Sequence, residues 1–150
     1  MHVLILGAGG MIGSKLAAAL GDACEIGGKP IEKMTLVDVV PVRVADDALD
    51  NVETLVLDVA SPGAAERIAE LRADVIFHLA AIVSGEAEKD FEKGYLVNLD
   101  GTRNLFEAIR LEHEKSGHVP RVVFSSSVAV YGAPLPDPIP DDHILAPRTS

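Results

Sequence analysis

A cluster of glycines near the start of the chain has the spacing of a phosphate-binding turn. An apolar run of strand length at 1–6 precedes the cluster, and a helix-forming segment at 14–20 follows it. Such a turn brings backbone N–H groups and the positive end of a helix dipole towards an anion. The residues predicted to contact the anion are Gly7, Gly10, Met11, Ile12 and Gly13. A turn with no ligand is the alternative, because a glycine-rich turn alone is a weak signal.

An acidic residue in the second apolar segment indicates which nucleotide the turn would bind. Asp38 lies towards the end of the strand predicted at 34–40. A carboxylate at this place accepts hydrogen bonds from the adenosine ribose hydroxyls and repels the 2′-phosphate of NADP. No Arg or Lys follows it before Arg43, so NAD is the favoured cofactor. A solvated aspartate at a strand end is the alternative.

Further candidates follow the other predicted strands, because a ligand of a parallel sheet lies across the carboxyl ends of its strands. Asp58 can accept from the adenine amino group, or it serves a turn or a cap. Small side chains after Leu79, at Ala80 and Ala81, let a ligand lie against the backbone, although core packing explains them equally well. The three serines that begin at Ser125 can hold a substrate hydroxyl or carbonyl oxygen, or form only a polar strand exit.

Two polar residues stand among apolar neighbours and therefore need partners. Asn98 lies on a long amphipathic helix predicted for about 90–113, where a satisfied core amide and a cofactor contact are both possible. His78 lies in the strand predicted at 74–81, and we expect a packed strand residue there rather than a catalyst.

The elements that must position these residues alternate along the chain. Strands are predicted at 1–6, 34–40, 54–59, 74–81 and 121–125. Ser61 and Pro62 have the types of an N-cap and a first helical residue, and they predict a helix after the third strand. Gly94 and Gly101 each weaken the long helix by up to about 1 kcal/mol relative to Ala, which predicts a close neighbour at each. We expect a loop at 21–33, irregular chain at 46–53, and an extended proline-rich arm from Gly132 onward.

This alternation predicts the α/β fold class. Strands separated by helices form a doubly wound parallel sheet with right-handed crossovers, that is, a Rossmann-type NAD-binding domain. At 150 residues, the chain is expected to form one such domain, 1–150.

The bulk composition excludes several classes of partner. A formal net charge of −10 argues against nucleic acid or an anionic membrane, since either prefers a basic face. No apolar run approaches the roughly 18 residues of a membrane span. The five histidines and Cys24 have no metal-ligand spacing, so no metal site is predicted. The lone cysteine fits a reducing compartment, and we expect a cytoplasmic protein.

Together the motifs resemble those of the extended short-chain dehydrogenase/reductase superfamily, the NAD-dependent epimerase/dehydratases. The resemblance covers nearly the whole chain. It is carried by the glycine turn, Asp38, Asp58-Val59, the segments 78–81 and 97–102, and the segment from Ser125 to Gly132. Three further segments, 82–88, 90–95 and 139–142, resemble more narrowly the D-erythronate dehydrogenase branch.

The resemblance implies a site and a reaction. Val59 would join the cofactor-binding residues, and Ser127 would be the catalytic serine that orients the substrate hydroxyl. A tyrosine phenolate would take the hydroxyl proton, a lysine four residues later would hold that tyrosine, and hydride would pass to NAD. For D-erythronate the product would be the 2-keto acid. The family also implies a homodimer formed through the long helix at 90–113.

The sequence departs from the family at the general base. Tyr95 is followed four residues later by Leu99, and Tyr131 by Leu135, so neither has the required lysine. We therefore expect the 150 residues to be the N-terminal part of a longer enzyme, truncated before the catalytic Tyr and Lys. Since such a base contributes typically 10²- to 10⁴-fold, the piece alone is expected to be nearly inactive.

Three functions are compatible with the motifs. The first is an NAD-dependent dehydrogenase acting on a small hydroxy acid. The second is a nucleotide-sugar epimerase or dehydratase, which shares these N-terminal motifs and acts on a sugar derivative. The third is a non-catalytic NAD-binding module.

Overall fold

The computed structural model describes residues 1–44 and 51–148. Their main feature is one sheet of strand order β5-β4-β1-β6-β7 in which every neighbouring pair is parallel. The strands are β1 His2–Leu6, β4 Lys33–Asp38, β5 Val52–Val56, β6 Val75–His78 and β7 Arg121–Phe124. The chain starts in the centre, builds one side and then returns to build the other. This order confirms the predicted doubly wound α/β fold.

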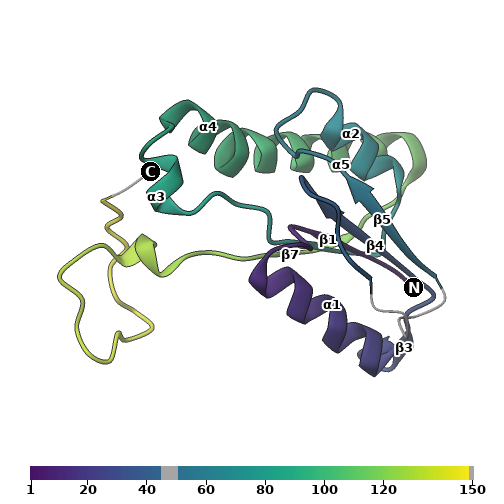
Figure 1. Cartoon of the computed structure of the whole chain (residues 1–150), viewed down its shortest axis with the longest axis horizontal. Helices are drawn as coiled ribbons and strands as arrows, with labels where there is room; N and C mark the ends of the chain where they lie inside the picture. The colour runs from purple at the N-terminus through teal and green to yellow at the C-terminus, as the bar shows by residue number, and fades with distance from the viewer. Residues whose placement is uncertain (45–50, 149–150) are drawn as a thin grey trace.

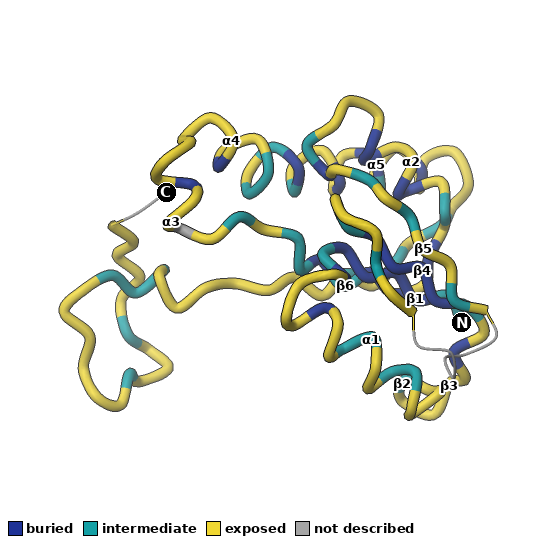
Figure 2. Tube along the Cα trace, viewed as in Figure 1, coloured by how far each residue is buried: buried dark blue, intermediate teal, exposed yellow. Residues whose placement is uncertain are grey.

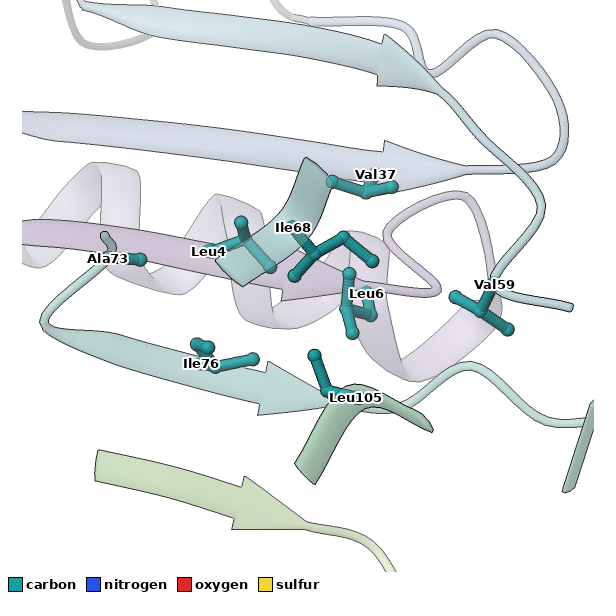
Figure 3. Close-up of a cluster of buried hydrophobic side chains, with 8 residues drawn as sticks. All are labelled: Leu4, Leu6, Val37, Val59, Ile68, Ala73, Ile76 and Leu105. Carbon is teal, nitrogen blue, oxygen red and sulfur yellow. The ribbon is translucent and has the colours of Figure 1, made fainter. Parts of the chain in front are cut away.

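Helices cover both faces of the sheet (Figure 1). Helix α1, Met11–Ala23, lies on one face, and α2, Ala64–Glu70, and α5, Thr102–Ser116, lie on the other. Strand β1 serves both layers, because side chains alternate between the faces of a strand. Leu4 and Leu6 pack under α2 and α5 (Figure 3), and Val3 and Ile5 pack on the α1 side. All four are fully buried, as Figure 2 shows for the central strands.

Several predicted boundaries were wrong. Ser61 and Pro62 do not begin a helix: α2 starts at Ala64, after Gly63 with φ +78°. The reason is that Asp58 O accepts from Ser61 N and Ser61 O accepts from Ala64 N, so the chain makes successive turns before the helix. The third strand runs over Val52–Val56 rather than 54–59. It therefore includes the end of the segment 46–53, which was expected to be irregular. Residues 46–50 of that segment lie outside the described residues.

The other differences are smaller. The second and fourth strands end at Asp38 and His78, earlier than expected. The predicted loop 21–33 contains the last turn of α1 and a short hairpin of β2, Glu25–Ile26, and β3, Lys29–Pro30. From Gly132 to Arg148 the chain forms no helix or strand, as expected for the arm. A single-turn 3₁₀ helix, η2 Val128–Tyr131, precedes it.

The long helix is built from three segments. These are α4 Phe91–Tyr95, a π-helical turn η1 Leu96–Gly101, and α5. Its two glycines have the close neighbours that the sequence predicted. A β-carbon on Gly94 would lie 2.9 Å from that of Ala87, at the end of helix α3, Ser84–Ala87, and one on Gly101 would lie 3.3 Å from Cγ2 of Val59.

The long helix also carries large apolar side chains that the described residues leave uncovered. The exposed ones along it are Phe91, Tyr95, Leu96, Leu99, Phe106 and Leu111, and Val123 and Phe124 are exposed on edge strand β7. Separately, in the described part of the chain, no helix combines the length and the apolar character that crossing a bilayer requires.

His78 is a packed residue of the sheet, only 1% exposed. Its Nε2 lies 2.9 Å from Oγ1 of Thr102 on α5, and its ring meets Phe124 edge-on. Because Thr102 Oγ1 donates its proton to Asn98 O, the hydroxyl accepts from His78 Nε2–H, and Nδ1 is then the unprotonated nitrogen. Burial lowers the pKa of His78 below its ordinary value, so the ring is neutral.

We predict that Gly94→Ala lowers the free energy of unfolding by about 1–3 kcal/mol, the usual cost of overpacking. The added methyl would meet Ala87 Cβ at 2.9 Å. The matched control is Gly21→Ala in α1, where a β-carbon meets nothing within 4 Å, and which should stabilise the helix by up to about 1 kcal/mol. Urea denaturation measures both. Equal stabilisation by the two substitutions would contradict the close contact.

We predict a pH dependence of stability that His78 causes. Its folded pKa lies below the unfolded value of about 6.5, so the unfolded state binds the proton more readily. The contribution is complete above that value and is lost as the pH falls below it, by up to about 1.4 kcal/mol per pH unit. His78→Gln keeps a partner for Thr102 but cannot titrate. Relative to this variant, the wild type should lose stability between pH 7 and pH 5, and parallel curves would refute the assignment. His2, whose pKa burial also lowers, is present in both proteins and cancels.

Candidate functional site

The glycine turn fits against its neighbours with no space for side chains. Gly7 has φ +82°, and a β-carbon there would lie 2.8 Å from Ala80 N. A β-carbon on Gly13 would collide with Gly7 O. The amides of Gly7 and Ala8 both donate to Val37 O, at 2.9 and 3.1 Å. The turn is therefore fixed between the ends of β4 and β6, next to the start of α1.

The N-terminus of α1 is open at this point. Gly10 is its N-cap and provides no side-chain hydrogen bond to the first turn. Met11 and Ile12 follow with side chains 70% and 57% exposed. Backbone N–H groups of the first helical turn have no partner within the helix, so this end presents donors and a partial positive charge.

Asp38 lies directly beside the turn. Its Oδ2 accepts a hydrogen bond from Gly9 N at 2.8 Å, and its Oδ1 accepts from Val40 N at 3.3 Å. A β-carbon on Gly9 would lie 3.1 Å from that Oδ2. Gly9 is thus a residue of the site that the sequence analysis missed, although its place within the glycine cluster was a usable signal.

These residues open onto a groove that runs across the carboxyl ends of the strands, which we call the strand-end groove. Its first half contains the glycine turn, and its second half contains the serines after β7; residues 80–83 line both halves, which are therefore neighbours. The predicted residues that line it are Gly7, Gly10, Asp38, Asp58, Val59, Leu79, Ala80, Ala81, Asn98, Ser125 and Ser127. Of the remaining three, Gly13 is buried within the turn, and Met11 and Ile12 lie at the exposed start of α1.

Asn98 holds the segment that both halves share. Its Oδ1 accepts from Ile82 N at 2.8 Å, and its Nδ2 donates to Ile82 O at 3.0 Å. The hydroxyl of Thr102 donates to Asn98 O at 3.1 Å. The amide is therefore satisfied by the backbone, which favours the first of the two interpretations left open. No pattern in the sequence predicts Ile82 as its partner.

Asp58 takes part in a turn and also faces the groove. Its Oδ1 accepts from Ala60 N at 2.9 Å, and its backbone oxygen accepts from Ser61 N at 3.0 Å. The turn role that the sequence allowed is thus present. Since the residue lines the groove as well, that role leaves a ligand contact possible.

Ser127 lies in the second half of the groove. Its Oγ accepts from Ala129 N at 3.2 Å, which caps the 3₁₀ turn, and the hydroxyl proton remains available to a ligand. The groove, as far as the chain is described, is lined by no tyrosine. Tyr131 packs against His143, and Tyr95 packs against Phe91.

The charged lining is mostly acidic. Besides Asp38 and Asp58, it contains Glu86 of α3 and Lys93 of α4, whose Oε1 and Nζ are 2.5 Å apart. Sequence analysis did not identify this ion pair, because its members lie seven residues apart on two short helices. Among the described residues, no three side chains of His, Cys, Asp or Glu gather in a way that would hold a metal ion.

The chain is similar to several known enzymes. A D-erythronate dehydrogenase of Cupriavidus necator is 42% identical over 154 residues, which include all of this chain and 46% of that protein. The solved structure of a nucleoside-diphosphate-sugar epimerase from Agrobacterium tumefaciens is 55% identical with a TM-score of 0.94, over 99% of this chain and 44% of that one. A uronate dehydrogenase mutant from the same organism, complexed with NAD, is 30% identical with a TM-score of 0.65, over 86% and 42%.

The chain thus spans less than half the length of each of these proteins. The sequence pattern of the NAD dependent epimerase/dehydratase family matches residues 3–150. The resemblance drawn from the motifs is confirmed: curated relatives at 42% and 34% identity are D-erythronate dehydrogenases, and the chain belongs to the NAD-dependent epimerase/dehydratase family.

Proposed function

We propose that the strand-end groove binds NAD, and that the full-length protein oxidises a small hydroxy acid such as D-erythronate to its 2-keto acid. The observation that carries the proposal is the Asp38 carboxylate, held beside the glycine turn by Gly9 N at 2.8 Å. A phosphate site and an acceptor for ribose hydroxyls are therefore adjacent, as a dinucleotide requires. The family match and the NAD complex of the uronate dehydrogenase support the same cofactor.

The residues present fit this cofactor. β-carbons at Gly7 and Gly13 would fill or distort the turn, so its glycines keep the backbone accessible to a pyrophosphate. The open N-terminus of α1, at Met11 and Ile12, would contribute N–H donors to it. Asp38 would accept from the adenosine ribose, and Asp58 and Val59 would lie against the adenine.

The second half of the groove is where we place the reaction. Ala80 and Ala81 would form the floor under the nicotinamide half, with Ser125 beside it, and Leu79 would contact the cofactor in the first half. Bound NAD supplies the acceptor for a hydride. Ser127 would orient the substrate by donating its hydroxyl proton to the substrate hydroxyl oxygen, whose carbon is the atom oxidised, since Ser127 Oγ already accepts from Ala129 N. The described groove is lined by no tyrosine; we propose a tyrosine base from elsewhere in the full-length protein, as the family resemblance implies.

The main alternative is a nucleotide-sugar epimerase, which the similarity to the nucleoside-diphosphate-sugar epimerase from Agrobacterium tumefaciens favours. Incubating the full-length protein with NAD and D-erythronate separates the possibilities. Steady production of NADH supports the dehydrogenase. Interconversion of a UDP-sugar without net NADH would support the epimerase instead, and NAD binding without turnover would support a non-catalytic module.

We also propose the homodimer and the cytoplasmic location expected from the sequence. The exposed apolar side chains along the long helix, such as Phe91, Leu99 and Phe106, would be covered by a second copy, because exposed apolar patches of this kind mark interaction surfaces.

The proposed cytoplasmic location is supported by the lone cysteine. Cys24 is exposed, and a reducing compartment tolerates an exposed thiol.

We predict that Asp38→Ala weakens NAD binding about 10- to 100-fold, since hydrogen bonds to a charged group contribute roughly 1.5–3 kcal/mol. Asp38→Asn retains an acceptor for Gly9 N but loses the charge. It should weaken NAD less and, like the alanine variant, improve NADP relative to NAD. Calorimetric titration of both cofactors measures the change. Unchanged affinity for NAD in both variants would refute the role of Asp38.

We predict that Ser127→Ala in the full-length protein lowers kcat about 10- to 100-fold while changing the Kd for NAD little, because the hydroxyl acts on the substrate. Ser127→Thr keeps the hydroxyl and should retain most of the activity. Thermal unfolding of both variants controls for the lost cap at Ala129. Turnover of the alanine variant at the wild-type rate would remove Ser127 from the catalytic residues.

A further inference from the structure

An ion pair stands at the rim of the first half of the groove. Glu86 of α3 and Lys93 of α4 both line it, and their Oε1 and Nζ are 2.5 Å apart. About half of each side chain is exposed, 54% and 53%. The pair is therefore within reach of both solvent and a ligand in the groove.

The backbone places this pair with little freedom. Gly94, next to Lys93, allows α4 to approach Ala87, next to Glu86. Asp90 caps α4 by accepting from Lys93 N at 3.1 Å. The two short helices are thus docked at the residues adjoining the ion pair, and any movement of the ammonium group is left to the flexible stem of the lysine.

The charges of the groove make Lys93 exceptional. Among the described residues that line either half, the acids are Asp38, Asp58 and Glu86, and Lys93 is the one cation. The pKa of Lys93 is raised by the hydrogen bond and charge of Glu86, and further by Asp90 and Asp58, so the ammonium group stays protonated. An acidic groove repels an anionic ligand unless a local cation offsets that charge.

We propose that Lys93 is the counter-charge that lets this acidic groove accept the anionic pyrophosphate of a dinucleotide, and that Glu86 holds the ammonium group at the rim until the ligand arrives. The inference rests on the proposed function, because it requires NAD in the groove. It assigns opposite effects to the two partners. Lys93 favours binding, whereas Glu86 opposes it by competing for the lysine and by adding a negative charge.

The test is calorimetric titration of NAD into the full-length protein and its variants. Lys93→Met should weaken NAD about fivefold, the scale of one exposed ionic contact. Glu86→Gln should tighten it by a similar or smaller factor. Lys89→Met is the matched control, because Lys89 is exposed, lies between α3 and α4, and does not line the groove; it should leave the Kd unchanged. All differences should shrink as salt is raised.

Two further ligands, ADP-ribose with a pyrophosphate and adenosine without phosphate, test whether Lys93 acts on the pyrophosphate. Lys93→Met should weaken ADP-ribose as it weakens NAD, and leave adenosine unchanged. Weaker NAD binding in both Lys93→Met and Glu86→Gln would overturn the inference, since the pair would then only dock α3 on α4. Unchanged NAD binding in Lys93→Met would overturn it while leaving the proposed function intact. Failure of the wild type to bind NAD would instead overturn the proposed function, and the inference with it.

Discussion

The glycine turn touches the backbone of its neighbours, and the rest of the site depends on that contact. Gly7 lies against Ala80, Gly13 lies under Gly7 O, and Gly9 lies against the carboxylate of Asp38. A methyl group at Gly7 or Gly13 would push the turn and the start of α1 away from the carboxyl ends of the central strands. Because none is present, the open end of the helix stands next to Asp38. The close packing of the glycine turn thus brings together two features that the proposed binding of a dinucleotide needs. These are N–H donors for phosphate and a carboxylate acceptor for ribose.

The long helix fixes the remaining parts of the groove. Gly101 packs on Val59, Gly94 packs on Ala87, and Asn98 pairs with both backbone groups of Ile82. The π-helical turn around Asn98 fits a pattern in which such turns gather at functional sites. One helix therefore positions Val59, the ion pair at the rim and the segment 80–83 that both halves of the groove share. Gly94, Gly101 and Asn98 are each explained by a contact with a neighbouring segment. Those contacts set the position of the groove on which the proposed function rests.

The sequence predicted the fold well because the signals were local. Continuous apolar runs identify buried parallel strands, and all five predicted strands are present with shifted ends. The helix predicted after the third strand is present, but it begins at Ala64 rather than at Ser61. Asp58, Ser61 and Ala64 bond one another in turns, a competition that N-cap preferences do not register. Of the site, the strand-end residues could be identified from topology alone. Gly9 could have been included from its place in the glycine cluster. The pairing of Asn98 with Ile82 and of Glu86 with Lys93 depends on contacts between elements, which no spacing encodes.

We propose that one groove, from the glycine turn to the serines after β7, binds NAD along its length. A crystal structure of the full-length protein with NAD tests it most directly. We expect the adenosine ribose at the carboxylate of Asp38, the pyrophosphate at the start of α1, and the nicotinamide beside Ser125 and Ser127. A cofactor bound in the reverse direction, or outside the strand-end groove, would contradict it.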